Sequence, residues 1–588
     1  MSTLRVYLAT NRYALVALAI IVTGYCTVLT PYFLNIPRED DFPELYGFVG
    51  RYANEGGFSS IIALYSDHRI ALLRLAGLVS VWLTGSINLQ QMGYVGIWLI
   101  IPATAWLFIR FFQRANVSAI YLLPVFLGLF QPQYYESVAK VDILYTLIPA
   151  ATMTGWAIYS ALFGKTLTWQ LSGAIVWCTL ATLTFGSGLF AWFVVGLVWL
   201  IDRRWRYAIG WYALTGLVTW LYMQGHERSG YMHDITGPFL RDNYQYILQG
   251  WLSFLGAALS EGTTPSAWNA VLGGFIVSTF GYLTVRNLFF SQQSTAFSRA
   301  QTGLLLWLAC TLIIGGVTAL GRVSGSDGVW TMLLGRYKFY TALAIVLTYS
   351  AIIFQYTNQR HFILTAGGLL TLVFSGWSYN TYLPEMDARY NSYVASIVNW
   401  QRTGSGLCYW NQVEGDSIMR EAIQNGYYKF PENLPLVQVV DSIGIQRSAA
   451  TQINSTLHID QKTITRSFGN IRFREDIFTF RNDKVMSRPR RGDGMYLLLK
   501  NARFTYVLAT EPKPYRGHNP LKRQAGYTVT MRSTPYRPGK YAIYEMRIDH
   551  KKARLQPTGK FVVIDNPHLS PEVTSTHKSA SVTHPSVR

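Results

Sequence analysis

Long apolar stretches recur along the chain and stop near residue 380. A helix that crosses a membrane needs about 20 mostly apolar residues, because the hydrocarbon core is about 30 Å thick and a helix rises about 1.5 Å per residue. The pattern therefore predicts a mainly α-helical, polytopic bundle with about eleven transmembrane helices. We expect these spans at residues 13–34, 92–112, 117–132, 142–163, 167–185, 187–202, 207–224, 267–289, 302–321, 339–357 and 361–380.

Two further apolar stretches, 70–85 and 246–258, are short for a crossing. The first follows the charged run 67–69, which is typical of an amphipathic helix that lies in the membrane interface. The loop after the first span is also amphipathic, at 45–52 and at 58–64. We therefore predict interfacial helices in this first outer loop, which would fold back over the spans.

Lys and Arg near the ends of the spans predict the orientation, because cytoplasmic loops carry an excess of these residues. If the N-terminus is cytoplasmic, the turns on the cytoplasmic side all carry Lys or Arg. An odd number of spans then places everything after residue 380 outside the cytoplasm. The cations of the predicted inner face are Arg5, Arg12, Arg110, Arg114, Lys165, Arg203, Arg204, Arg206, Arg286, Arg299 and Arg360.

The chain divides by pattern into a membrane domain at 1–380, an outer domain at 381–566 and a tail at 567–588. Helical spacing at 385–402 and 416–427, together with alternating apolar and polar stretches, predicts a small α/β domain. The tail is rich in Ser, Thr, His and Pro, which is typical of disorder. We expect strands near 496–499, 504–508, 527–531 and 541–546.

The composition supports a membrane protein. Half of the residues are hydrophobic and only 14% are charged, whereas soluble proteins carry about 25% charged residues. The net charge of +20 divides into +7 on residues 1–380 and +13 on residues 381–588, where 30 Lys and Arg face 17 Asp and Glu. Because the basic domain is predicted to lie outside the cytoplasm, nucleic acid is not an expected partner.

The first outer loop carries three consecutive carboxylates, Glu39, Asp40 and Asp41. Three such groups at a membrane surface repel one another, so at least one should have a raised pKa or a cationic partner. This arrangement suits a general base or a metal site, and a solvated charged loop is the alternative. The loop ends in Asp67, His68 and Arg69.

Two other outer turns carry charges at the membrane boundary. The turn 131–142 holds Glu136, Lys140 and Asp142. Ionisable groups in this position are costly and indicate function, although Glu136 and Lys140 also have the spacing of a plain i,i+4 helix pair. Because its two His have no ligand spacing, the mixed-charge loop 226–242 is a weak metal candidate.

A glycine-rich stretch between two spans contains Arg322 and, further on, Arg336, Tyr337 and Lys338. Arg binds phosphate through two parallel hydrogen bonds and Lys supplies a point charge, so this stretch predicts an anionic site. A flexible loop with snorkelling cations is the alternative. A carboxylate and a phosphate-type site on one face would suit transfer of a group from a lipid phosphate to a hydroxyl.

At these residues the sequence resembles the GT-C superfamily, integral membrane glycosyltransferases that use polyprenyl-phosphate-linked sugars. Members carry acidic residues after the first span, as at Asp40-Asp41, and a His motif before an interfacial helix, as at 66–70. They have a short second outer turn with an acidic residue, as at 134–142. In a bacterial subset a Gly-Arg turn precedes an Arg-Tyr pair, as at 321–322 and 336–337.

This resemblance, which covers roughly residues 1–380, implies roles for individual residues. Asp40 or Asp41 would be the catalytic base of an inverting transfer, and Arg322 and Arg336 would hold the lipid phosphate, with Lys338 as a weaker candidate. The sugar and acceptor sites would be shaped by Glu39, Asp67, His68, Arg69, Glu136, Lys140, Asp142 and Tyr337. No cofactor is required, although a divalent metal, Mg²⁺ or Mn²⁺, is left open because relatives differ.

The resemblance further implies a bacterial inner-membrane enzyme that decorates a cell-envelope glycan on the periplasmic side, in the manner of enzymes that glucosylate O-antigen. Its partners would be a polyprenyl-phosphate sugar, an envelope glycan or lipid-linked oligosaccharide, and membrane lipid. A polymerase or ligase of lipid-linked glycans is the nearest alternative, and a transporter or flippase is the alternative from another class.

Overall fold

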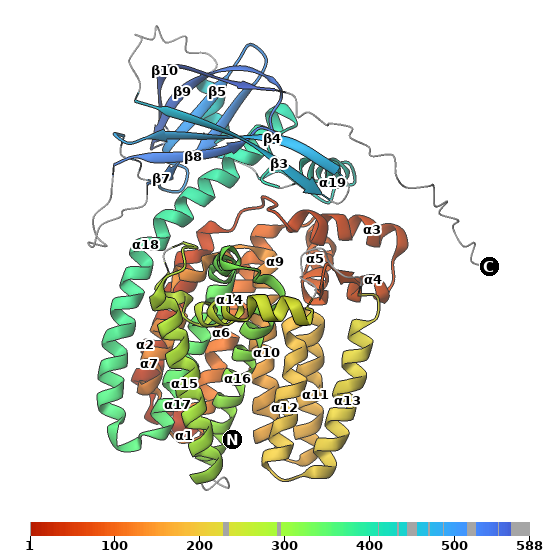
Figure 1. The fold of residues 1–588 in the computed structure, drawn as a ribbon, viewed down its shortest axis with the longest axis vertical. Helices are drawn as coiled ribbons and strands as arrows, with labels where there is room; N and C mark the ends of the chain where they lie inside the picture. Colours follow the sequence, from red (N-terminus) through yellow and green to blue (C-terminus); the bar gives the residue numbers. More distant parts are fainter. Residues whose placement is uncertain are drawn as a thin grey trace, which may run out of the picture. The chain divides into compact units, whose positions relative to one another are not determined.

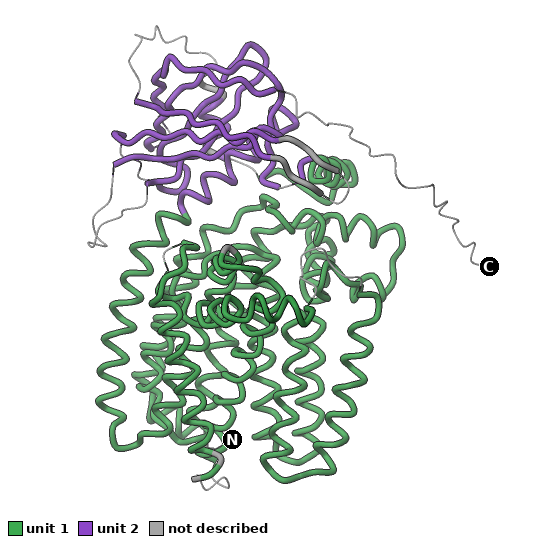
Figure 2. Tube along the Cα trace, in the orientation of Figure 1, with its two compact units in different colours: residues 1–386, 413–432, 519–521 green, residues 387–412, 433–518, 522–588 purple. Residues whose placement is uncertain are grey.

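The computed structural model describes residues 2–226, 235–260, 262–290, 296–409, 411–431, 434–443, 456–468, 471–485, 487, 489–513, 525–550 and 552–565. The chain forms two compact units (Figure 2). Unit 1 comprises residues 1–386, 413–432 and 519–521, and unit 2 comprises 387–412, 433–518 and 522–588. The predicted tail 567–588 and residues 227–234 of the loop 226–242 lie outside the described residues.

Unit 1 is a bundle of long apolar helices, and Figure 1 shows α10 to α13 running side by side in it. Its long elements and their short extensions are α1 Ser2–Thr10, α2 Arg12–Leu29, η1 Thr30–Tyr32, α6 Leu89–Arg114, η3 Ala119–Leu122, α7 Leu123–Leu129, α10 Leu147–Phe163, α11 Leu167–Thr184, α12 Leu189–Ile201, α13 Trp205–Met223, α15 Ala267–Phe290, α16 Ala296–Arg322, α17 Lys338–Gln355 and η9 Thr357–Gln359; α18, Arg360–Thr403, continues into unit 2.

Seven helices among the described residues are long and apolar enough to cross a membrane, so the chain is a multi-pass membrane protein by helix length and composition. A helix is found at each of the eleven expected spans. Four of these helices are not both long and apolar enough to count among the seven. Ala119–Leu129 and Gly186–Ile201 are too short, and α11 and α13 are too low in mean hydropathy. The seven are Arg12–Tyr32, Leu89–Arg114, Val141–Phe163, Ala267–Asn287, Ala296–Arg322, Gly335–Gln355 and Thr357–Thr403.

Short elements between the long helices carry most of the candidate residues. Figure 1 shows α3, α4, α5 and α9 at one end of the long helices of unit 1, and α14 lying across them. The helices predicted in the first outer loop are therefore present. These elements are η2 Phe42–Tyr46, α3 Gly47–Glu55, α4 Phe58–Ile62, β1 Leu64–Tyr65, β2 His68–Arg69, α5 Ala71–Thr84, η4 Pro132–Tyr134, α8 Tyr135–Ala139, α9 Val141–Leu144, η5 Gly186–Gly188, α14 Gly237–Leu255, η6 Ala257–Leu259, η7 Ser326–Leu333, η8 Gly335–Tyr337 and α19 Gln412–Gln424.

Asn35 fixes the start of the first outer loop within unit 1. Its side-chain oxygen accepts a hydrogen bond from the Leu89 backbone N–H at 2.9 Å, and its amide donates to the Lys429 carbonyl at 2.8 Å. The Tyr428 hydroxyl donates to the Asn35 carbonyl at 3.1 Å. Because these groups are buried, each bond avoids the cost of an unpaired polar group. The chain after the first span therefore enters the site from a fixed point.

Unit 2 is β-rich, and it also contains the end of α18 and the helix α20 (Pro435–Ile443), so helices and strands are both present as expected. It contains two four-stranded antiparallel sheets, with strand orders β10-β9-β5-β6 and β3-β4-β8-β7. The predicted strands are present as β5, β6, β8 and β9, but β3, β4 and β10 were not predicted. The elements are α20 Pro435–Ile443, β3 His458–Phe468, β4 Ile471–Asn482, β5 Gly494–Lys500, β6 Thr505–Ala509, β7 Glu511–Pro512, β8 Tyr527–Arg532, β9 Gly539–Asp549 and β10 Lys552–Ile564.

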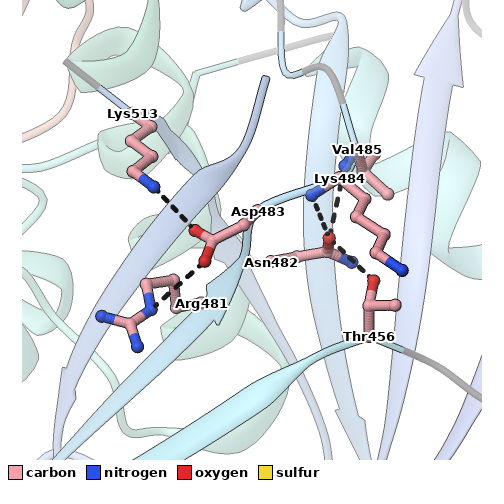
Figure 3. A network of polar contacts seen from close by, with 7 residues as sticks. All are labelled: Thr456, Arg481, Asn482, Asp483, Lys484, Val485 and Lys513. Atoms are coloured by element: carbon pink, nitrogen blue, oxygen red, sulfur yellow. Dashed lines mark hydrogen bonds and ion pairs between the residues drawn. The ribbon is translucent and has the colours of Figure 1, made fainter. Parts of the chain in front are cut away.

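A polar network fixes the end of β4 (Figure 3). The Asn482 side-chain oxygen accepts hydrogen bonds from the Thr456 hydroxyl and from the backbone N–H groups of Lys484 and Val485. Asp483 forms an ion pair with Lys513 at 3.0 Å and lies 3.9 Å from Arg481. Asn side chains commonly bond the backbone two or three residues ahead in this way, so the network is a structural turn.

Candidate functional site

The first outer loop turns sharply just before the carboxylates. Glu39 has a φ of +42°, a left-handed conformation that is uncommon for a residue with a side chain. The Asp41 N–H then donates to the Arg38 carbonyl at 2.8 Å, and the Glu44 N–H donates to the Asp40 carbonyl at 3.0 Å. The chain thereby enters η2, a short π-helical segment, directly after the turn, with Asp41 immediately before it and Glu44 within it.

Asp41 is buried, with 2% of its surface exposed. Its Oδ2 accepts a hydrogen bond from the Arg38 N–H at 3.1 Å, whereas its Oδ1 has no partner among the described residues. Burial, together with the neighbouring charge of Asp142, raises the pKa of Asp41 well above its usual value, against the opposing effects of Arg38 and Lys140. Asp41 therefore favours its protonated form.

The raised pKa of Asp41 predicts a pH-dependent gain in stability for Asp41→Asn. Because the folded state binds this proton more tightly than the unfolded chain, the proton stabilises the fold fully below about pH 4 and progressively less as pH rises through the raised pKa. Asparagine does not titrate, so the unfolding midpoint of the variant in detergent should rise relative to wild type from about pH 4 to pH 8. A difference that is constant with pH would contradict this. Exposed Asp549 supplies the control, Asp549→Asn.

Asp40 lies next to Asp41 but keeps part of its surface exposed. Burial and then the charge of Glu39 raise its pKa, whereas the charges of Lys140 and Arg336 oppose the rise. Two cations from separate outer turns therefore act on one carboxylate of the first loop. Together with the ion pair between Lys140 and Glu39, these charges associate residues of three outer turns.

Glu44 is a buried carboxylate that the sequence reading did not select. It is 8% exposed, and burial, followed by the charges of Asp142, Asp40 and Asp41, raises its pKa well above the usual value. Arg74 opposes that rise. Its place three residues after Asp41 was the available signal, although only the fold shows that this segment is buried.

The second outer turn supplies a cation, a buried acid and a close contact. Lys140 forms an ion pair with Glu39, and Asp142 is 6% exposed. Glu136 packs against Gly335, where an added Cβ would lie only 2.5 Å from its Oε2. The Glu136 side chain therefore lies directly against the backbone that precedes Arg336.

Arg336 has unused hydrogen-bonding capacity. Its Nε is buried without a partner among the described residues, and its guanidinium lies 5.3 Å from the centre of the Tyr337 ring. The Arg336 carbonyl accepts a hydrogen bond from the Ser137 hydroxyl at 2.9 Å, which fixes η8 against the second turn. An arginine held by its backbone, with a free donor, suits an anionic ligand.

Lys338 is placed differently. It is 2% exposed, and its Nζ donates to the Ser260 carbonyl at 3.0 Å and to the Tyr382 hydroxyl at 3.1 Å. These contacts hold the cation inside the protein. Neighbouring Tyr337 is also buried, and its ring centre lies 5.7 Å from that of Phe254.

His68 belongs to a second group of residues, at the β1–β2 hairpin. Its ring centre lies 4.1 Å from that of Phe185, and its Nδ1 is buried without a partner among the described residues. Burial lowers the pKa of His68 to about 4, with Asp67 opposing and Arg322 adding to the shift. His68 is therefore a neutral imidazole at pH 7, and Arg322 is close enough to act on it.

The hairpin is anchored to the end of α13. Arg69 donates to the Tyr222 and Gln224 carbonyls at 3.1 Å each, and His226 contacts the Asp67 carbonyl at 3.2 Å. The sequence reading did not associate Tyr222 or His226 with this motif. Both residues contact the hairpin although they lie more than 150 positions from it in the chain. Motif spacing does not reveal such contacts.

Segment η5 links the two groups. An added Cβ at Gly186 would lie 2.6 Å from His68 Nδ1, so η5 passes directly against the imidazole. The next residue, Ser187, forms a hydrogen bond of 2.9 Å with the Tyr340 hydroxyl, four residues after Arg336. The carboxylates, Arg336 and the His68 group therefore belong to one connected region of unit 1.

A metal could bind at one cluster in the part of the chain that the structure describes. The one group there of three metal-ligating side chains whose ligand atoms lie within 4.8 Å of one another is Asp493, Asp549 and His550, in unit 2. The carboxylates of the first outer loop do not form such a group in this arrangement. Nothing in their geometry therefore specifies a set of metal ligands.

No protein-family model matches the chain, and no curated protein matches its sequence. Fold and composition define a class: a multi-span helical membrane protein with a C-terminal β-rich domain.

Proposed function

We propose that this chain is an inverting membrane glycosyltransferase that moves a sugar from a polyprenyl monophosphate to a cell-envelope glycan. The proposal assigns unit 1 to the GT-C type of bundle, with eleven spans and interfacial helices in the first outer loop. It places the carboxylate end of unit 1 and the C-terminal domain on the periplasmic side of a bacterial inner membrane. The resemblance at the four motifs supports this choice.

The observation that carries the proposal is that three outer turns come together: Lys140 forms an ion pair with Glu39, Glu136 packs against Gly335, and the charges of Lys140 and Arg336 act on Asp40. A half-buried carboxylate and a half-buried arginine, whose Nε has no partner among the described residues, supply a base and an anion-binding group in the same region. Charges in such a site interact more strongly than in water. This pairing is what transfer from a lipid phosphate to a hydroxyl requires.

In the proposed reaction Asp40 accepts the proton of the acceptor hydroxyl. The hydroxyl oxygen attacks the anomeric carbon of the donor, and the bond from that carbon to the phosphate oxygen breaks. The electron pair leaves with the lipid phosphate, whose growing negative charge Arg336 stabilises. Arg322 would bind the same phosphate or the sugar near His68.

Between the two adjacent aspartates we assign the base to Asp40. A general base must reach the reacting proton, and Asp40 keeps an exposed edge whereas Asp41 is 2% exposed. A base must also be ionised: burial raises the pKa of both carboxylates, but that of Asp41 rises well above its usual value, whereas Lys140 and Arg336 oppose the rise at Asp40. Asp41, Glu44 and Asp142 would then shape the site beneath it.

A transporter or flippase is the functional class that most needs separating from this proposal. Purified protein in proteoliposomes, given a polyprenyl-phosphate sugar with a radiolabelled sugar and an envelope glycan, should convert the label covalently into glycan. A transporter would leave the label on the lipid and change only the leaflet in which it is found. Label that moves between leaflets with no glycan product would therefore refute the enzymatic proposal.

A further inference from the structure

Arg38 is a buried arginine in the first outer loop, 5% exposed, and the sequence reading assigned it no role. Its Nη2 donates to the Tyr32 carbonyl at 3.2 Å, and its Nη1 donates to the Ala139 carbonyl at 3.0 Å. Its backbone N–H donates to Asp41 at 3.1 Å. One residue thus contacts the end of the first span, the second outer turn and a site carboxylate.

The two carbonyls explain why a cation is placed there. Tyr32 is the last residue of η1, and Ala139 is the last residue of α8. Carbonyl groups at the ends of helices lack partners within the helix, and a positive charge there is favourable. The planar guanidinium reaches both because its donors point in fixed, separate directions.

We propose that Arg38 is a positioning residue that clamps the first outer loop to the second outer turn and so holds Asp40 opposite Lys140 and Arg336. Residues 39–41 follow Arg38 directly, whereas Lys140 follows Ala139 directly. The bond from Arg38 to the Ala139 carbonyl therefore sets the separation of the two charged segments. The effect of this bond on catalysis rests on the proposed function, whereas its effect on the separation of the two segments does not.

Arg74 is a matched control for a buried arginine that binds carbonyls. It is 2% exposed, and its Nη1 donates to the carbonyls of Ser60, Ile61 and Ala63. All three acceptors lie in the first outer loop itself, so these bonds do not join that loop to the second turn. Loss of Arg74 should affect stability without separating Glu39 from Lys140.

The separation of the two segments can be measured without an activity assay. In a full-length Glu39→Cys, Lys140→Cys, Cys408→Ser protein, a short bifunctional thiol reagent should join the two new cysteines quickly, because Glu39 and Lys140 are in contact. The remaining cysteines, Cys26, Cys178 and Cys310, are buried. We expect Arg38→Gln to slow crosslinking at least tenfold and Arg74→Gln to leave it within twofold.

Activity provides the second readout. Displacement of a catalytic group by about 1 Å can cost about 10²-fold in rate, so Arg38→Gln should lower kcat by about 10-fold to 100-fold with little change in the KM for the lipid donor. The kcat of Arg38→Lys, which keeps the charge but reaches only one carbonyl, should lie between those of the wild type and Arg38→Gln. If Arg38→Gln does not fold, Arg38→Lys carries the crosslinking comparison, with an expected slowing of at least threefold.

Unchanged crosslinking in the folded Arg38 variant would overturn the clamp, whatever the activity. Slower crosslinking in a protein that is inactive with every lipid-linked sugar would uphold the clamp and refute the proposed function instead. Slower crosslinking with unchanged kcat would overturn the positioning role. The two hypotheses therefore fail separately.

Discussion

Replacing Asp40 with Asn is expected to lower the rate of sugar transfer by about 10²–10⁴-fold, the usual contribution of a general base. Asparagine has nearly the same shape but accepts no proton. Because Asp40 is partly exposed and lies in the turn before η2, the variant should remain folded. Initial rates with a radiolabelled polyprenyl-phosphate sugar, together with unfolding midpoints in detergent, measure both effects.

Asp41→Asn is the matched control, one residue away. An asparagine oxygen can accept the same hydrogen bond from the Arg38 N–H, and a neutral side chain suits a position where burial favours the protonated acid. We expect transfer within about tenfold of wild type, a small part of what a general base contributes. The reverse order of effects would move the base to Asp41, and full activity in both variants and in the double variant would remove the base from this loop.

Replacing Arg336 with Gln should have the second largest effect. Loss of one group that stabilises the developing negative charge typically costs about 10²–10³-fold in kcat. The substitution also removes a cation whose charge acts on Asp40, so the pKa of Asp40 should rise and the acidic limb of the rate profile should move to higher pH. Arg336→Lys should recover only part of the rate, because an ammonium cannot make two parallel hydrogen bonds to phosphate.

Arg110→Gln provides the control for a partly buried arginine elsewhere in unit 1. Arg110 lies in α6, where it donates to the Tyr159 hydroxyl, and it takes no part in the proposed reaction. Steady-state rates against donor concentration, measured at several pH values, compare the variants. If Arg336→Gln and Arg110→Gln lose the same small amount of activity, Arg336 does not bind the phosphate.

The sequence predicted the helices well because apolar length is a local property. Every expected span contains a helix, and the amphipathic stretches of the first outer loop form α3 and α4. Prediction of strands was less complete. Strand β10 alternates in burial, but it contains Pro557 and Gly559, residues typical of turns, and its register shifts between Pro557 and Phe561.

The charged groups of the site were identified in part. Lys140 pairs with Glu39, and the charges of Lys140 and Arg336 act on Asp40, whereas the roles expected for these residues stay predictions. Lys338 also borders an apolar span, but its amine points to buried oxygen atoms instead. The direction in which a side chain leaves its helix depends on the packing of neighbours, and local sequence does not contain it.

The roles of Arg38 and Glu44 required the fold for a different reason. Both lie beside the recognised carboxylates, yet a charged residue in an outer loop is usually solvated. Their burial comes from α8, which supplies the Ala139 carbonyl to Arg38, and from α5, which supplies Arg74 near Glu44. Long-range packing of this kind decides whether a charged side chain has a structural role, takes part in catalysis or is solvated.

Competition between donors tests the central claim most directly. Purified protein in proteoliposomes would receive one sugar on a polyprenyl monophosphate and the same sugar, with a different label, on a polyprenyl diphosphate. The account predicts that glycan product carries the label of the monophosphate donor, with one lipid monophosphate released for each sugar transferred. Product formed from the diphosphate donor alone, or no covalent product from either, would contradict it.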